Sequence, residues 1–289
     1  MLAIVGGLGA ALVFATVTLC NSRSSRMIGP THLLAWVMLI GLAIVAPLVV
    51  VEGVPDELDN ESGAWLAVAG FGNVVGLLLA YAALRVGKVG VVAPVVATQG
   101  AVAALLAVLA GESIGAGAGL TLVVIAVGVV LAGLARGSSE PDTPRSAAEQ
   151  GTAPRPLPYA LAAAFAIGCS LYATARASID LPVVWALLPS RVIGVAAVTV
   201  PLALRSGLRM TPEALPLVAV AGVCEVLGFA LFALGARHGI AVSAVLASQF
   251  AAVAAVAAYF LFGERLARVQ LAGVALIVVG VAVLSALDA

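Results

Sequence analysis

The sequence predicts an all-α integral membrane protein, in which ten transmembrane helices form two inverted five-helix repeats around a central cavity. Three observations lead to this prediction. The 289-residue chain is too apolar for a water-soluble surface, it divides into ten apolar segments, and polar residues of one half recur in the other at a constant offset.

The composition excludes most soluble classes. Hydrophobic residues make up 63% of the chain and charged residues 10%, with a mean hydropathy of +1.19. A soluble domain carries about 25% charged residues. The composition therefore argues against a cytosolic enzyme, a nucleic-acid-binding protein and a disordered chain, and it favours the lipid bilayer as the solvent of the outer surface.

Ten segments are long and apolar enough to cross a bilayer, for which a helix needs about 20 residues. The first segment lacks a basic flank and a clear cleavage site, which favours a membrane helix over a signal peptide. The predicted spans are residues 3–20, 31–51, 63–84, 89–110, 115–134, 158–175, 181–204, 212–234, 240–262 and 266–287.

A polar segment separates the spans into two groups of five. Residues 135–157 contain four prolines among Ser, Thr and charged residues, and are predicted to form a flexible cytoplasmic linker. We therefore predict one five-helix repeat in residues 1–134 and a second in residues 158–289.

The two groups resemble each other at an offset of 152 residues. The polar and glycine matches support the duplication, because apolar matches are common in this composition. Since five helices are an odd number, the second repeat must enter the membrane upside down, a construction typical of secondary transporters. The offset pairs Arg85 with Arg237, Gly87 with Gly239, and Gly111–Glu112 with Gly263–Glu264.

Lys and Arg predict the orientation. With the loops numbered alternately, eleven basic residues fall on one side of the membrane and Arg176 and Arg237 on the other. The side with eleven basic residues is predicted to be cytoplasmic, so both termini and the acidic loop 52–61 face outward from a bacterial-type inner membrane.

Two ionisable residues are predicted at mid-membrane, where charge is costly and points to function. Glu225 lies near the middle of span 212–234, and Arg191 near the middle of span 181–204. One interpretation is a buried ion pair that neutralises both charges. The other is a polar cavity in which Arg191 binds a carboxylate and Glu225 binds an ammonium group or a proton, which would suit a zwitterion such as an amino acid.

Uncharged polar residues form a second group of candidate substrate contacts. For the hydroxyl residues the alternative is a hydrogen bond to the backbone of a helix. Pro94 is the candidate hinge of the fourth span. The candidate contacts are Asn73 (at the repeat position of Glu225), Tyr81, Gln99, Ser170, Tyr172, Ser243 and Gln249.

Motifs of common membrane enzymes and pumps are absent from the sequence. It contains no GxxxxGK[ST], HExxH or GxSxG pattern and no metal-ligand spacing, so we expect no ATP-driven pump, no cofactor and no metal. An intramembrane lipid-modifying enzyme would need paired acidic motifs at a membrane face, whereas only the loop 52–61 is rich in acids.

The sequence combines ten spans in two halves, Arg-x-Gly turns, and a fourth span that runs into Gly111–Glu112. With these features the chain resembles the EamA-like branch of the drug/metabolite transporter superfamily. Met38 or its neighbours replace the Arg often seen in the second helix of that family, while Arg191 keeps the seventh-helix copy. The resemblance implies a non-enzymatic exporter of a small metabolite that works by alternating access.

The subgroup of YddG-type exporters is similar in architecture and length, and this similarity favours amino acids, including aromatic ones, as substrates. Drugs and nucleotide sugars are the alternatives within the same fold. The expected partners are the substrate and the lipid bilayer, with no nucleic acid. A monomer is compatible with the sequence, which leaves the oligomeric state open.

Overall fold

The computed structural model describes residues 1–86, 89–113, 115–133, 156–205 and 207–262, together with positions 269, 272–273, 275–276, 279–280 and 283. Throughout this part of the chain the regular structure is helical. Six helices are long and apolar enough to cross a membrane. The prediction of an all-α membrane protein is therefore confirmed at this level.

The helices follow the predicted spans. Each of the first nine predicted spans contains at least one helix that the structure describes. The described positions within the tenth span are helical as well. The unbroken helices are α1 (Leu2–Ile28), α2 (Pro30–Glu52), α3 (Asn60–Val86), α6 (Ala116–Gly133), α7 (Pro156–Asp180) and α10 (Leu215–Ala236).

Several boundaries differ from the prediction by a few residues, and two of the differences have an identifiable cause. Helix α1 continues eight residues beyond position 20, because Ser22 and Ser24 donate their hydroxyls to carbonyls of their own helix, at 2.8 Å each, so these polar residues stay helical. Helix α7 begins at Pro156, inside the predicted linker. Proline suits the first turn of a helix because no hydrogen bond requires its missing N–H there. Residues 134–155 and Gly263–Glu264 lie outside the described residues.

The fourth and ninth spans are each broken in the middle. The fourth consists of α4 (Val89–Ala97) and α5 (Gln99–Leu109), and the ninth of α11 (Ile240–Ala247) and α12 (Phe250–Phe262). At the breaks, the hydroxyls of Thr98 and Ser248 donate to carbonyls three residues earlier, at 2.7 and 2.6 Å. Each break lies at a hydroxyl residue that is followed by Gln, and its hydroxyl bonds to the turn before it.

The seventh span widens into a π-helix. It consists of α8 (Val183–Gly194), η1 (Val195–Thr199) and α9 (Val200–Arg205). Pro201 has no N–H to donate into the preceding turn, and the wide turn η1 ends two residues before it.

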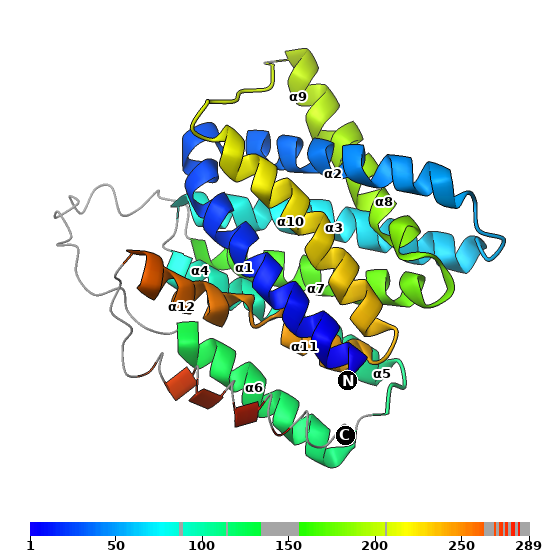
Figure 1. Cartoon of the computed structure of the whole chain (residues 1–289), viewed down its shortest axis with the longest axis vertical. Helices are drawn as coiled ribbons and strands as arrows, with labels where there is room; N and C mark the ends of the chain where they lie inside the picture. The colour runs from blue at the N-terminus through cyan, green and yellow to red at the C-terminus, as the bar shows by residue number, and fades with distance from the viewer. Residues whose placement is uncertain are drawn as a thin grey trace.

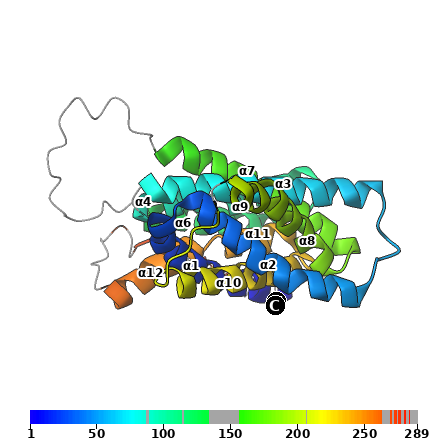
Figure 2. The same cartoon turned by 90° about the horizontal axis from the view of Figure 1, so that it is seen from above.

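The halves interlock rather than sitting apart (Figures 1 and 2). Seen from above, α3 and α7 lie on one side of the molecule and α1 and α10 on the other (Figure 2). Helix contacts between the halves come in matched pairs. Helix α1 packs on α10, as α7 packs on α3. Helix α2 packs on α10, as α8 packs on α3. Helix α11 packs on α1, as α5 packs on α7.

Glycines at matching positions allow these close contacts. A Cβ atom on Gly76 of α3 would lie 2.4 Å from Cγ1 of Ile167 in α7. A Cβ atom on Gly228 of α10, at the 152-residue offset, would lie 2.5 Å from Cε1 of Phe14 in α1. Small residues at these two positions let the backbones of the two halves approach each other, as is usual for helix packing in membranes.

Polar contacts at the helix ends also join the halves. The indole of Trp36 in α2 donates to the carbonyl of Arg209, and that of Trp185 in α8 donates to Gly53, at 3.1 and 2.8 Å. The carboxylate of Glu112, from one of the Gly-Glu motifs, accepts the N–H of Ala241 in the first turn of α11 at 3.3 Å. A carboxylate at a helix N-terminus satisfies a free donor and the helix dipole.

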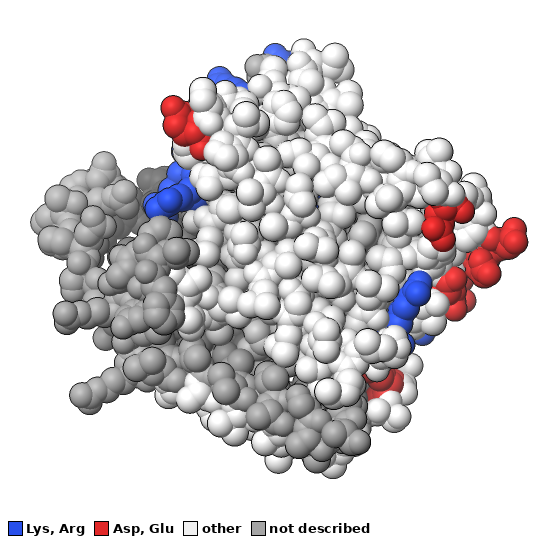
Figure 3. All heavy atoms as spheres, in the orientation of Figure 1, with Lys and Arg blue, Asp and Glu red and all other residues white. Residues whose placement is uncertain are grey.

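The outer surface has the charge distribution of a multi-pass membrane protein. On the face shown in Figure 3, the described Lys, Arg, Asp and Glu side chains lie towards the margins, and an uncharged band lies between them. Large hydrophobic side chains such as Val51 and Leu204 are more than 80% exposed. Such exposure suits lipid as the solvent.

The glycine contacts can be tested by adding one methyl group. We expect Gly76→Ala to lower the free energy of unfolding by about 1–3 kcal/mol, because the methyl group forces α3 and α7 apart. Gly63→Ala in the same helix is the control, since nothing lies within 4 Å of its Cβ position and alanine gains up to about 1 kcal/mol of helix propensity. Thermal unfolding in detergent measures both. Equal melting temperatures for the two variants would contradict the packing argument.

Candidate functional site in a cavity between the two halves

A cavity of about 80 Å³ lies where α1, α3, α7 and α10 meet, and residues of α4, α5 and α12 complete its wall. The wall is mostly apolar and includes Phe14, Phe229 and Phe250. Its polar members are Thr18, Asn21, Tyr81, Gln99 and Glu225. A ligand pocket commonly combines an apolar wall with a few polar groups in this way.

The single charged residue among the described residues of this wall is paired. Oε1 of Glu225 in α10 lies 3.1 Å from Nη1 of Arg191 in α8, and both side chains are buried. Of the two interpretations of this pair, the ion pair is present, and Glu225 lines the cavity as well. Arg191 is fully buried and is not among the residues that line the cavity.

Arg191 is held from several sides by apolar groups. Its Nη1 lies 3.7 Å from Sδ of Met38 in α2, and its Cζ lies 5.9 Å from the ring centre of Phe229. Gly41 leaves room for the side chain, since a Cβ atom there would lie 2.7 Å from Cδ of Arg191. A guanidinium over an aromatic face gains a cation–π interaction.

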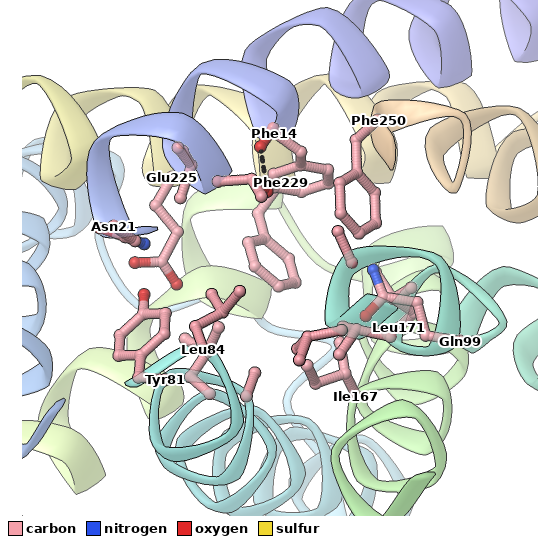
Figure 4. A pocket seen from close by; sticks show the side chains of 17 residues that line it. Phe14, Asn21, Tyr81, Leu84, Gln99, Ile167, Leu171, Glu225, Phe229 and Phe250 are labelled. Carbon is pink, nitrogen blue, oxygen red and sulfur yellow. Dashed lines mark hydrogen bonds between the residues drawn. The ribbon is translucent and has the colours of Figure 1, made fainter. Parts of the chain in front are cut away.

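Three polar groups gather at one end of the cavity (Figure 4). The Glu225 carboxylate, the Tyr81 hydroxyl and the Asn21 amide lie close together, whereas Gln99 lies apart from them beside Leu171. Within the described structure no hydrogen-bond partner reaches either oxygen of Glu225, the Tyr81 hydroxyl, either amide atom of Asn21 or Oε1 of Gln99. The ion pair is close, but its N–H groups do not point at the carboxylate.

These unpartnered groups distinguish the cavity from ordinary packing. A buried polar group without a partner costs about 1–3 kcal/mol. Several such groups around one cavity are therefore an arrangement that water or a polar ligand stabilises, and the volume of about 80 Å³ is sufficient to hold water.

Three of the nine predicted substrate residues, Glu225, Tyr81 and Gln99, line this cavity. The hydroxyls of Ser170 and Ser243 donate instead to the carbonyls of Ala69 and Phe232, at 2.7 and 3.3 Å. Both serines therefore follow the alternative prediction for hydroxyl residues, a hydrogen bond to a helix backbone in place of a substrate contact.

The remaining candidates also lie away from the cavity wall. Gln249 donates to the carbonyl of Val245 at 2.9 Å, and Tyr172 packs edge-on against Trp65 with ring centres 5.6 Å apart. Asn73 is buried in α3, and its amide has no partner among the described residues. Pro94 lies in α4, four residues before the break at Thr98.

Asn21, Thr18 and Phe14 also line the cavity, although none of them was among the site residues predicted from the sequence. The first span was predicted to end at residue 20, which excluded Asn21 from the membrane. Positions 14, 17, 18 and 21 all line the cavity, and they have the i, i+3, i+4, i+7 spacing of one helix face. This spacing was the signal that could have identified them.

A second, polar pocket of about 180 Å³ lies at the acidic loop before α3. Asp59 there accepts the N–H of Ser62 at 2.8 Å, which caps α3 and lowers the pKa of Asp59. Glu61, Asp180 and Arg176 also line the pocket. Over the described residues, no group of three or more His, Cys, Asp or Glu is arranged to hold a metal ion.

Comparison with known proteins identifies one family. The EamA-like transporter family matches residues 1–134 and 155–286. The chain also matches 23 chains of solved structures. One, titled only "Crystal structure of protein", aligns with a TM-score of 0.73 and 21% identity over 99% of this chain and 96% of that one, a similarity of fold. No curated protein matches the chain.

The ion pair leads to a prediction about stability. We expect Glu225→Gln to lower the free energy of unfolding by about 3–5 kcal/mol, because it leaves the guanidinium of Arg191 buried and uncompensated. The double variant Glu225→Gln/Arg191→Met should recover most of this loss, since it removes both charges. Thermal unfolding in detergent compares the three proteins. If Glu225→Gln is as stable as the unaltered protein, the buried guanidinium of Arg191 does not need the charge of Glu225, and the prediction is wrong.

Proposed function

Since the chain belongs to the EamA-like transporter family, we propose that it is a secondary transporter that exports small metabolites. Amino acids, including aromatic ones, are the proposed substrates. The observation that carries this proposal is the cavity between the halves, where Glu225 is the one acidic side chain among the described residues of a mostly apolar wall that includes three phenylalanines. Glu225 would accept hydrogen bonds from a substrate ammonium group, and Tyr81, Asn21 and Gln99 would bind its other polar atoms.

The size and charge of the cavity favour a small substrate. Its volume of about 80 Å³ is below the roughly 300–1,000 Å³ of sites for drug-sized ligands. A nucleotide sugar would need cations for its phosphates, and the described residues of the cavity wall include neither Lys nor Arg.

We propose that the fold is a ten-helix inverted repeat, with halves in residues 1–134 and 158–289 joined by a linker at 135–157. The matched helix contacts between the halves and the paired glycines Gly76 and Gly228 support this proposal. In such folds the substrate site lies between the repeats, and one half rocks against the other to expose it to each side in turn. The breaks at Thr98 and Ser248, with Pro94 near the first, are the proposed points of bending.

The proposed location is a bacterial-type inner membrane, with both termini outside the cytoplasm. The excess of Lys and Arg on one side of the predicted spans supports this orientation.

Removal of the Tyr81 hydroxyl provides a test of the proposed site. Tyr81→Phe removes a group without a hydrogen-bond partner in the described structure, so it should leave thermal stability unchanged or higher. If Tyr81 binds substrate, the KM for uptake into proteoliposomes should rise about two- to tenfold, as expected for the loss of one hydrogen bond. The control is Tyr159→Phe on the exposed surface of α7, which should change neither quantity.

The substrate class is identified in the same assay by a competition panel of amino acids, sugars and aromatic dyes. An unchanged KM for Tyr81→Phe would remove this cavity as the substrate site. Competition by sugars or dyes but not by amino acids would contradict the proposed substrate.

A further inference from the structure

Of the two residues in the buried ion pair, Glu225 lines the cavity and Arg191 does not. Glu225 is part of the cavity wall, and both of its oxygens lack an aligned donor in the described structure. Arg191 is fully buried and lies outside the wall. A substrate in the cavity therefore meets the carboxylate, while the guanidinium stays behind it.

From this arrangement we propose that the site recognises a protonated amine and does not require a carboxylate on the substrate. Arg191 is then a positioning residue that acts through Glu225. This inference rests on the proposed transport function, and it widens the substrate class from amino acids to small apolar primary amines, including amino-acid amides.

The surroundings of Arg191 support a fixed guanidinium. It lies against Met38 on one side and the Phe229 ring on another, in a space that only a glycine at position 41 leaves open. The cation–π contact with Phe229 and the ion pair with Glu225 both hold the guanidinium in its place outside the wall. Binding a substrate carboxylate with a bidentate guanidinium is therefore disfavoured.

The charge on the cavity wall supports an amine as the ligand. Apart from Glu225, the polar groups that the structure describes on the wall are the neutral side chains of Thr18, Asn21, Tyr81 and Gln99. An ammonium group gains charge-assisted hydrogen bonds to Glu225. A substrate carboxylate finds only neutral donors there, and the anionic Glu225 lies beside them.

Arg191 makes this arrangement stable without a ligand. A lone carboxylate at this depth would be strongly destabilised, whereas the ion pair with Arg191 compensates its charge. The positive charge behind Glu225 thus keeps an anionic site available inside an apolar wall.

Ligand binding to the purified full-length protein in detergent tests the inference. The probe is radiolabelled phenylalanine, and the competitors are phenylalanine amide and phenethylamine, which keep the amine, and N-acetylphenylalanine and 3-phenylpropionate, which lack it. We expect the two amines to bind within about threefold of phenylalanine, and the two acids to bind at least about tenfold more weakly, because they lose the charge-assisted hydrogen bonds to Glu225.

The outcomes separate the inference from the proposed function. If phenylalanine binds and the amide and phenethylamine do not, the carboxylate is required and the inference is wrong, while amino-acid transport stands. If phenethylamine binds directly and phenylalanine does not, the inference holds and the amino-acid substrate is wrong. Absence of binding by every amine in the panel would overturn both.

A variant of Arg191 tests the positioning role. Arg191→Lys keeps the charge and should still bind amines, with Kd for phenylalanine and phenethylamine raised by the same factor. A guanidinium that contacted the substrate carboxylate would instead weaken phenylalanine alone, so a changed ratio of the two Kd values would overturn the assignment. Arg191→Met, where it folds, should weaken both ligands more than Arg191→Lys does.

Discussion

A buried carboxylate and a buried guanidinium must compensate each other, and this constraint ties together the centre of the protein. Glu225 of α10 and Arg191 of α8 lie 3.1 Å apart, and Arg191 packs on Met38 and Gly41 of α2. A buried charge that loses its partner is strongly destabilising. The three helices are therefore held in one register, and that register also places Glu225 on the cavity wall.

The cavity exists because the halves interlock through small residues instead of large ones. Gly76 and Gly228 bring α3 onto α7 and α10 onto α1, and these four helices form most of the cavity wall. Without a hydrophobic force between helices in lipid, close backbone approach and polar contacts carry the association. The same residues that pack the halves therefore set the shape of the site between them.

Sequence periodicity predicted most of the helices, because a membrane requires long apolar segments and leaves few other folds. It failed at the end of α1, where serines bonded to their own helix allow polar residues to continue it and bring Asn21 to the cavity. It also failed to separate Tyr81 from Ser170. Both are polar residues of apolar helices, and only their neighbours show that one faces a cavity and the other a carbonyl.

The sequence by itself determined the membrane class and the approximate spans, and it marked a candidate duplication and Glu225 and Arg191 as candidate site residues. It could do so because burying a charge in lipid is costly enough to mark the few residues that do it. Only the tertiary structure decided how these two residues are used. Helix rotation and packing between distant segments put Glu225 on the cavity wall and Arg191 behind it. Spacing along the chain can mark one face of a helix, but it does not tell whether that face meets a cavity or a neighbouring side chain.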